Sequence, residues 1–268
     1  MLENLSLDGK TVVITGGGTG LGREMVLAMA RAGADMVIAS RRPGPIEEVA
    51  DMVREIGPRA LAISTDVTDT SSVNSLFEKA LGEFGKVDVL FNNAGIVRGQ
   101  GSIPIWEITD EQWRIGIDTN LSGAFYCSRA IAKHMADRGS GKIVSVASGF
   151  GFRGGRDNYM YACGKGGVIQ LTRTLATSLG RYGITATGIA PGYIPTEGTS
   201  ESNETLPRGE FIPLGRVGYP HEMGPIAVFL ASSASDYMNG ETLVIDGGGL
   251  AGGFAPTGYA PEIPLEVP

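Results

Sequence analysis

The strongest constraint on the fold is a glycine-rich stretch between a strand pattern and a helix pattern near the start of the chain. Residues 10–15 (KTVVIT) form a short β-branched run, which predicts a buried strand. Gly16, Gly20 and Gly22 follow, and residues 23–32 then carry apolar side chains at helical spacing. In a strand–loop–helix unit, such glycines let the backbone approach a phosphate at the helix N-terminus. The sequence therefore predicts a dinucleotide-binding unit here.

Strand and helix patterns alternate along the rest of the chain. Strands are expected at 36–39, 60–64, 87–91, 142–147, 185–189 and 241–245, and helices at 46–56, 71–84, 161–181 and 224–232, with two more helical patterns within 109–134. This alternation predicts a single doubly wound Rossmann α/β domain over residues 1–268, built on a parallel seven-stranded sheet. The polar run 195–215 predicts a lid, and residues 249–268 form a Gly/Pro-rich tail.

Composition excludes several kinds of protein. The formal net charge is −7, from Lys+Arg 22 and Asp+Glu 29, which argues against binding to nucleic acid. There is no apolar run of about 18 residues, and residues 1–10 lack the basic and apolar regions of a secretory signal. Cys127 and Cys163 are the only cysteines, and His134 and His221 lie far apart, so we expect no disulfide framework and no metal site. These features predict a cytoplasmic protein without a membrane partner.

The second predicted strand ends in Ser40-Arg41-Arg42. In dinucleotide folds, an acidic residue near this position binds the ribose 2′-hydroxyl. A hydroxyl and guanidinium groups would instead bind a 2′-phosphate, so these residues favour NADP(H) over NAD(H) as cofactor. The alternative is that the two arginines are simply solvated before the loop that contains Pro43 and Pro45.

Ser148, Tyr161 and Lys165 form a candidate catalytic set. Residues at i and i+4 share one face of a helix, so Tyr161 and Lys165 are expected side by side. A phenol has an ordinary pKa near ~10, and a neighbouring cation lowers it. The Ser148 hydroxyl could hydrogen-bond an oxygen that gains charge during reaction. The set suits proton transfer at a carbonyl or alcohol oxygen, although this spacing also occurs in proteins where it has only a structural role.

The fourth predicted strand runs into Asn92-Asn93-Ala94-Gly95. Ligands in open α/β sheets bind at the carboxyl ends of strands, where small residues and amides are useful. A simple turn is the other interpretation of this tetrapeptide.

Together these motifs resemble those of the short-chain dehydrogenase/reductase family, over about residues 5–249. The resemblance rests on motifs that occur in the family's order and at its usual separations: Thr15-Gly16-xxx-Gly20-x-Gly22, Asn92-Asn93-Ala94-Gly95, Asn120, Ser148, Tyr161-xxx-Lys165, Pro191-Gly192 and Asp246-Gly247-Gly248. Residues 183–197 and 216–220 are similar to its gluconate 5-dehydrogenase-like branch and also to 3-oxoacyl reductases.

The resemblance implies a role for each matching residue. Tyr161 would be the general acid and base, Lys165 would lower its pKa and hold the nicotinamide ribose, Ser148 would polarise the substrate oxygen, and Asn120 would hold a water that relays protons to solvent. Asp66 and Val67 would meet the adenine, Asn93 and Gly95 would flank the cofactor, and Thr196 would bond the nicotinamide amide. The full set of expected cofactor contacts is Gly16, Thr19, Gly20, Leu21, Gly22, Ser40, Arg41, Arg42, Asp66, Val67, Asn93, Ala94, Gly95, Tyr161, Lys165, Pro191, Gly192, Ile194 and Thr196. The resemblance also implies a homotetramer that pairs the helices at 120–134 and 161–181.

The helix that begins at Tyr161 is unusually glycine-rich, with Gly164, Gly166 and Gly167 in its first turns. Each helical glycine costs about 0.5–1 kcal/mol relative to alanine. This cost indicates close approach by a neighbour, and the resemblance places a subunit interface there. Cys163, between the catalytic pair, is interpreted as a small packing residue.

The predicted function is an NADP(H)-dependent oxidoreductase that interconverts a secondary alcohol and a ketone. Rival hypotheses are a dinucleotide-binding regulatory protein without turnover and a structural protein. Arg98, Arg153 and Arg156 flank the expected cleft and suggest a sugar acid or keto acid substrate, unless they are solvated or touch another subunit. The alternative is a 3-oxoacyl or bulky neutral ketone held in an apolar pocket. The expected substrate contacts are Ser148, Phe150, Phe152, Arg153, Tyr161 and Tyr193.

Overall fold

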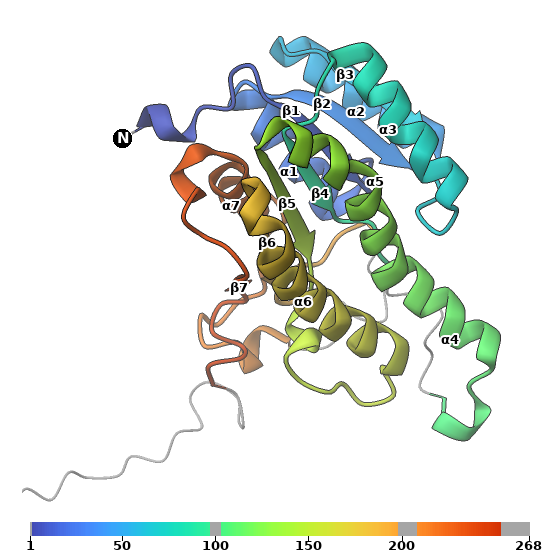
Figure 1. Ribbon diagram of the computed structural model, residues 1–268. Coiled ribbons are helices and arrows are strands. Elements are labelled where there is room, and N and C mark those ends of the chain that lie inside the picture. The colour runs from blue at the N-terminus through green and yellow to red at the C-terminus, as the bar shows by residue number, and fades with distance from the viewer. Residues whose placement is uncertain (1, 97–102, 198–207, 253–268) are drawn as a thin grey trace, which may run out of the picture.

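Seven parallel strands form one sheet in the computed structural model, in the order β3-β2-β1-β4-β5-β6-β7 (Figure 1). The structure describes residues 2–96, 103–197 and 208–252. The strands are β1 (Thr11–Thr15), β2 (Asp35–Ser40), β3 (Ala60–Ser64), β4 (Val89–Asn92), β5 (Gly141–Val146), β6 (Ile184–Pro191) and β7 (Thr242–Ile245). Because the order reverses between β1 and β4, the carboxyl ends of these two strands flank a crevice suited to a ligand. The predicted parallel seven-stranded sheet is confirmed.

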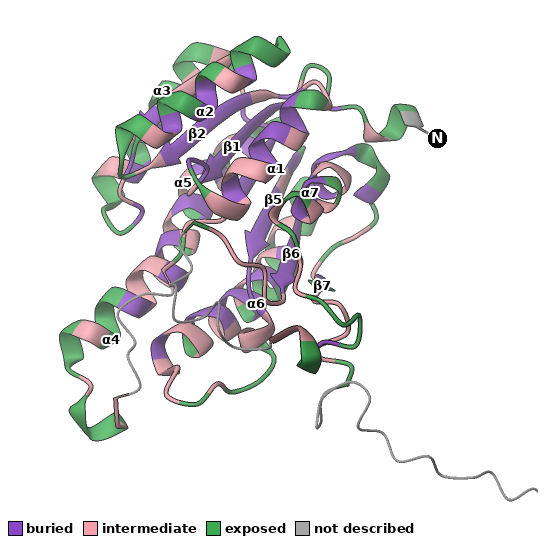
Figure 2. Cartoon of the chain, turned by 180° about the vertical axis from the view of Figure 1, so that it is seen from behind, coloured by how far each residue is buried: buried purple, intermediate pink, exposed green. Residues whose placement is uncertain are grey.

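Helices cover both faces of the sheet, as Figure 2 shows by the purple strands lying between exposed helices. On one face lie α1 (Gly20–Arg31), α2 (Pro43–Ile56) and α7 (Met223–Ala231), which share one apolar cluster. On the other face lie α3 (Thr70–Phe84), α5 (Gly123–Arg138) and α6 (Tyr159–Leu179). The short helix α4 (Asp110–Ile117) packs on α6. The result is a three-layer, Rossmann-like α/β domain.

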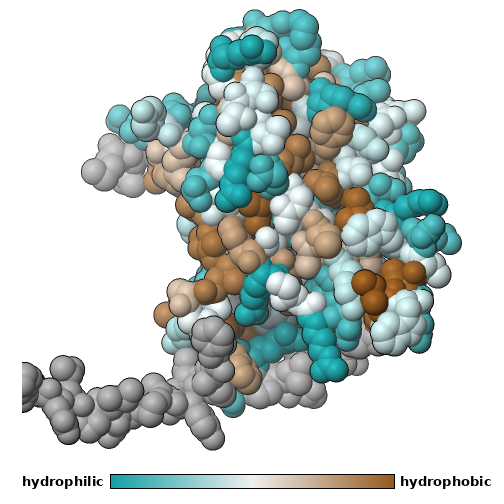
Figure 3. All heavy atoms as spheres, turned by 60° about the horizontal axis from the view of Figure 1, so that its bottom comes forward, coloured by the Kyte–Doolittle hydropathy of each residue, from teal (hydrophilic) through white to brown (hydrophobic). Residues whose placement is uncertain are grey.

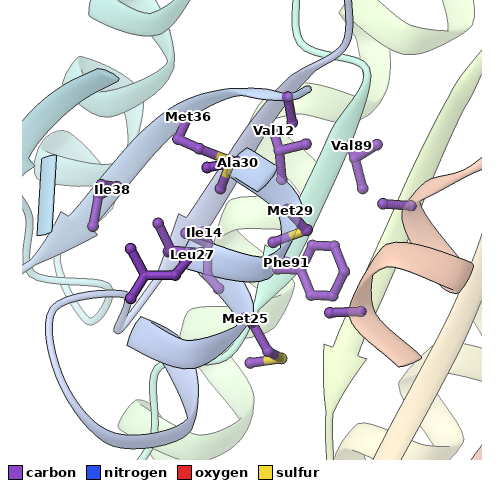
Figure 4. Packing of buried hydrophobic residues seen from close by; sticks show 14 of the residues in the cluster. Val12, Ile14, Met25, Leu27, Met29, Ala30, Met36, Ile38, Val89 and Phe91 are labelled. Atoms are coloured by element: carbon purple, nitrogen blue, oxygen red, sulfur yellow. The ribbon is translucent and has the colours of Figure 1, made fainter. Parts of the chain in front are cut away.

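Side chains alternate along the central strands and so build both cores. Val12 and Ile14 of β1 face the cluster under α1, whereas Val13 between them faces the opposite cluster. Figure 4 shows the first cluster, where Met25 and Met29 of α1 lie over β1 and β4. Burying each such side chain stabilises the fold by roughly 1.5–3 kcal/mol, so the two clusters hold the strand ends in fixed positions.

Most element boundaries lie close to the sequence expectations, but α1 and α2 begin three residues earlier, at Gly20 and Pro43, and the region between α4 and α5 differs. Pro43 and Pro45 therefore lie in the first turn of α2 and not in a loop, because proline is tolerated where the helix N–H groups have no partner. The helical pattern over 109–134 becomes two helices that are joined by a π-helical turn, Asp118–Ser122, and the second helix continues to Arg138. A capping box between Thr109 and Gln112 starts α4. The π-helical turn contains Asn120, whose side chain bonds to a neighbouring loop rather than to solvent. π-helical turns of this kind are frequent at functional sites.

The expected lid over 195–215 lies partly outside the described residues, and so does most of the tail over 249–268. The described part of the first segment includes a 3₁₀ turn, Arg208–Phe211. Its role as a lid stays a prediction. Among the described residues, no helix is both long enough and apolar enough to span a membrane.

Candidate active site

The glycine loop joins β1 to α1 and is fixed by the segment after β4. The Asn93 side-chain amide donates to the carbonyls of Thr15 and Gly16, at 3.0 Å each. Gly16 and Gly20 adopt φ of +69° and +54°, which glycine tolerates best. A Cβ added at Gly22 would collide with the Gly16 carbonyl oxygen. The loop therefore needs glycine for its close packing, and its backbone remains close enough to bind a phosphate.

A cavity of about 410 Å³ runs along this loop. It is lined by Gly16, Gly18, Thr19, Ser40, Arg41, Arg42, Pro45, Thr65, Asp66, Val67, Ala94, Gly95, Ile96 and Thr119. Most of these residues were predicted as cofactor contacts, and the others are Gly18, Pro45, Thr65, Ile96 and Thr119. The cavity thus joins the loop to the ends of β2, β3 and β4, as an extended dinucleotide requires.

At one end of the cavity, basic side chains follow β2 and an acidic side chain follows β3. Burial alone would raise the pKa of Asp66, but hydrogen bonds from the Thr68 backbone and hydroxyl and the charge of Arg41 hold that pKa below its ordinary value. Ser40 Oγ donates to the Arg42 carbonyl at 3.3 Å. The guanidinium groups of Arg41 and Arg42 are on exposed residues at the cavity wall. This end can hold an adenosine with a phosphate on its ribose.

Ser148 and Tyr161 meet beyond the carboxyl end of β5. Ser148 is 8% exposed, and its Oγ accepts a hydrogen bond from the Phe150 amide at 3.2 Å. Tyr161 lies in the first turn of α6, where burial raises the pKa of its phenol. A hydrogen bond with Ser148 offsets that rise in part. The two hydroxyls form a pair that can share a proton with one substrate oxygen.

Lys165 and Asn120 complete the cluster, and both lie next to Gly95 in the segment that follows β4. Lys165 is 4% exposed, and its Nζ donates to the Val146 carbonyl at 2.7 Å. A Cβ built on Gly95 would lie 2.8 Å from Asn120 Oδ1 and 3.1 Å from Lys165 Nζ. The Asn120 amide itself is held by the Ile96 backbone, at 3.1 Å and 3.0 Å. The four expected catalytic residues are therefore brought together, and the proton-relay role of Asn120 stays a prediction.

The pKa shifts of Tyr161 and Lys165 differ from the sequence expectation. Lys165 was expected to lower the pKa of Tyr161, whereas burial raises the pKa of this phenol above its ordinary value. Lys165 Nζ lies 5.7 Å from the centroid of the Tyr161 ring and bonds to a backbone carbonyl instead. Burial lowers the pKa of Lys165 itself, to about 8. The phenol is thus protonated at neutral pH.

The segment after β6 reaches back to the glycine loop. The Gly192 amide donates to Ile245 at 2.8 Å, and a Cβ on Gly192 would lie 2.6 Å from Asp246 Cβ, so the Pro191-Gly192 turn is packed against the end of β7. Further on, Thr196 Cγ2 lies 3.2 Å from the Cβ position of Gly20. Of the expected cofactor residues of this segment, Thr196 therefore lies at the N-terminus of α1, whereas Pro191 and Gly192 lie at the end of β7.

The expected substrate residues surround Tyr161 unequally. The Phe150 ring packs edge-on against Tyr161, with centroids 6.3 Å apart, and Arg153 Cζ lies 5.7 Å from the Phe150 centroid. Phe152 is 44% exposed. Arg156 is 96% exposed and lies 3.7 Å from the carboxylate of Asp157, so it points away from this group. Arg98 lies outside the described residues.

Two contacts at the site were not foreseen. Arg208 stacks on Tyr193, with Cζ 4.3 Å from the ring centroid, and Glu197 accepts a hydrogen bond from the Gly20 amide at 3.2 Å. Neither residue carries a motif, because each meets its partner through tertiary packing. The side chain of Leu21 packs against the apolar cluster beneath α1, and its contact with the cofactor stays a prediction.

The face that lies at the bottom of Figure 1 is brought forward in Figure 3, where apolar surface gathers near the middle and hydrophilic side chains surround it.

No group of three or more His, Cys, Asp or Glu side chains that could hold a metal ion occurs within the described ranges.

Comparisons with known proteins show which family the chain belongs to. A family model described as short chain dehydrogenase matches residues 10–207. A 2-dehydro-3-deoxy-D-gluconate 5-dehydrogenase from Dickeya dadantii (strain 3937) is 40% identical over 260 residues, covering 94% of this chain and 99% of the relative. A 3-oxoacyl-(acyl-carrier-protein) reductase FabG from Chlamydia pneumoniae is 34% identical over 248 residues, covering 91% and 98%.

Among solved structures, a gluconate 5-dehydrogenase from Burkholderia cenocepacia J2315 in complex with NADP and tartrate superposes with a TM-score of 0.86. It is 34% identical, and the match covers 94% of this chain and 99% of that one. The fold and the site define an oxidoreductase built on a Rossmann-like domain. The chain belongs to the short-chain dehydrogenase/reductase family, whose members use a nicotinamide cofactor.

Proposed function

We propose that the protein is an NADP(H)-dependent oxidoreductase that interconverts the secondary alcohol and the ketone of a sugar acid or keto acid. The observation that carries the proposal is the convergence of Ser148, Tyr161 and Lys165 beyond β5, next to the glycine-lined cavity. The loop around Gly16 and Gly22 fits a dinucleotide, since the glycines let it fold tightly against the segment after β4 and the N-cap of α1 makes no side-chain hydrogen bond, which suits a pyrophosphate at that helix end. When bound, the nicotinamide supplies the hydride chemistry.

The residues of the chain handle the proton. In ketone reduction, the neutral Tyr161 phenol donates its proton to the carbonyl oxygen as that oxygen gains charge, and in alcohol oxidation the phenolate takes the proton back. Ser148 hydrogen-bonds Tyr161 and lies close enough to share the same substrate oxygen. The Lys165 ammonium, fixed on the Val146 carbonyl, adds positive charge beneath the reacting groups.

The choice of NADP(H) rests on the end of β2. Ser40, Arg41 and Arg42 line the cavity where an acidic residue would repel a 2′-phosphate. Ser40→Asp should therefore lower kcat/KM for NADPH relative to NADH by at least tenfold, because its carboxylate would repel the 2′-phosphate. A tenfold change corresponds to about 1.4 kcal/mol. Native kcat/KM that is higher with NADH would contradict this choice.

The acidic substrate is supported by Arg153 and by the related proteins. Arg153 lies over Phe150, whose ring packs on Tyr161, so its guanidinium is near the substrate side of the phenol. The relative from Dickeya dadantii acts on 2-dehydro-3-deoxy-D-gluconate, and the Burkholderia structure contains tartrate. The second candidate is a 3-oxoacyl or other apolar ketone, which the FabG relative and the rings of Phe150, Phe152 and Tyr193 favour.

The test is a substrate panel with NADP⁺ or NADPH: 2-dehydro-3-deoxy-D-gluconate, D-gluconate, a neutral polyol and a 3-oxoacyl thioester. We expect turnover of the acids, and Arg153→Ala should raise KM for an acid more than KM for its neutral ester. Arg156→Ala is the matched control, because Arg156 is exposed beside Asp157 and should change neither KM. Preference for the thioester would select the second candidate, and NADPH binding without turnover of any substrate would favour a regulatory protein.

A further inference from the structure

Glu197 occupies the position at the N-terminus of α1 where a phosphate would bind. Its Oε2 accepts a hydrogen bond from the Gly20 amide at 3.2 Å, and its Oε1 lies 3.7 Å from Arg23 Nη1. The carboxylate thus has a backbone N–H donor and a guanidinium as partners, which are the groups that hold a phosphate oxygen at such a helix end.

Nothing in the first turn of α1 competes with Glu197 for this role. The N-cap residue Thr19 makes no side-chain cap hydrogen bond, and the first turn has no acidic residue. The unpaired amides and the helix dipole therefore favour an anion from outside the helix. Glu197 comes from the segment after β6, and Thr196 beside it packs on Gly20, so two neighbouring side chains of this segment contact the N-terminus of α1.

We propose that the Glu197 carboxylate is an intramolecular competitor for the pyrophosphate of the dinucleotide cofactor. A pyrophosphate that takes the Gly20 amide must displace Glu197, and the displaced carboxylate then remains close to the phosphate charges and repels them. Glu197 would therefore set the affinity for the cofactor below what the glycine loop alone allows. The proposal rests on the cofactor site of the proposed function.

The test compares two ligands that differ in the pyrophosphate. NADPH contains it, whereas 2′-AMP has the adenosine and the 2′-phosphate but no 5′-phosphate, so it reaches only the end of the cavity near Arg41 and Asp66. Dissociation constants are measured by calorimetry for the native protein, Glu197→Gln and Glu197→Ala. We expect both variants to bind NADPH about two- to fivefold more tightly, the factor that a charge at an exposed helix N-terminus typically contributes, with the affinity for 2′-AMP unchanged.

Glu83→Gln is the matched control, since it removes the same charge from a half-exposed glutamate that faces Arg59 on another part of the surface. It should leave both affinities at their native values. Equal or weaker NADPH binding in the Glu197 variants, with native 2′-AMP binding as proof of an intact fold, would overturn the proposal. Failure of the native protein to bind 2′-AMP would instead count against the proposed NADP(H) cofactor.

Discussion

Lys165 is the residue on which the electrostatics of the site depend most. Its ammonium is buried and has one hydrogen bond, to the Val146 carbonyl, so few groups replace the water that it loses on folding. This burial lowers the pKa of Lys165 to about 8. The protein therefore carries a destabilising charge at neutral pH, a cost expected where a functional group is held in place for chemistry.

The pH dependence of stability tests this view of Lys165. Below pH ~8 the folded and unfolded states both hold the proton, whereas between pH ~8 and ~10.4 only the unfolded state keeps it, so folding becomes more favourable as the pH rises. The native free energy of unfolding should therefore gain about 3 kcal/mol relative to Lys165→Met between pH 7 and pH 10.5. Urea denaturation at a series of pH values measures this.

Lys133→Met serves as the control, because Lys133 is 81% exposed and should follow the native pH dependence. Parallel curves for native protein and Lys165→Met would mean that the ammonium is not desolvated.

The sequence predicted which residues form the site more readily than how deeply each of them is buried and what it contacts. The spacing of Tyr161 and Lys165 placed them together on α6, and motif order added Ser148 and Asn120. The direction of the Tyr161 pKa shift was wrong, because burial depends on how η4 (Gly149–Gly151) and α6 pack, which spacing does not encode. Glu197 was missed for a similar reason, since it meets Gly20 across 177 residues of sequence.

At the scale of elements, the glycines of α6 let other parts of the chain approach closely. A Cβ on Gly164 would lie 2.9 Å from Asn120 Cβ, and one on Gly167 would lie 2.6 Å from Leu121 Cδ2. The close neighbour that the sequence predicted is therefore the π-helical turn of the same chain. Because Asn120 holds Ile96, these glycines also fix the segment after β4.

Two glycine substitutions in α6 should have opposite effects. Gly164→Ala forces Asn120 away and should destabilise the fold by about 1–3 kcal/mol, as overpacking does, and lower kcat. At Gly166 the nearest atom to an added Cβ is the Gly151 carbonyl oxygen at 3.6 Å, an ordinary contact. Gly166→Ala should therefore stabilise the fold by about 0.5–1 kcal/mol through helix propensity. Urea denaturation measures both, and equal stabilisation by the two would contradict the packing.

The sequence predicted most elements but not the π-helical turn between α4 and α5. Apolar periodicity marks a helix and depends on side-chain positions averaged over several turns. A single wide turn changes that pattern little, and it is stabilised here by the bonds from Asn120 to Gly116 and Ile96, which form only in the folded chain.

At the scale of the whole molecule, α5 presents an aromatic surface. Phe125 is 42% exposed, and Arg129 lies 5.3 Å from the centroids of both Phe125 and Tyr126. An apolar ring flanked by a guanidinium is typical of a protein–protein contact. This surface supports the predicted homotetramer, in which α5 and α6 pair across a two-fold axis.

Phe125→Glu should disrupt that assembly, because it would bury two like charges around the axis. We expect light scattering after size exclusion to give the mass of a tetramer for native protein and a smaller mass for this variant. Ile56→Glu, at the C-terminal end of α2, changes another exposed apolar side chain and should leave the mass unchanged. A native monomer at micromolar concentration would contradict the proposed tetramer.

The central claim is that Tyr161 transfers the proton in an NADP(H)-dependent alcohol–ketone interconversion. The most direct test is kcat/KM for a sugar acid with NADP⁺ in native protein, Tyr161→Phe and Tyr159→Phe, together with the NADPH dissociation constant of each. Tyr159 is the matched control in the same first turn of α6, where its hydroxyl faces Asp157. We predict a loss of ~10²–10⁴-fold in Tyr161→Phe alone, with cofactor affinity close to native in all three. A loss below about tenfold, or an equal loss in Tyr159→Phe, would contradict the account.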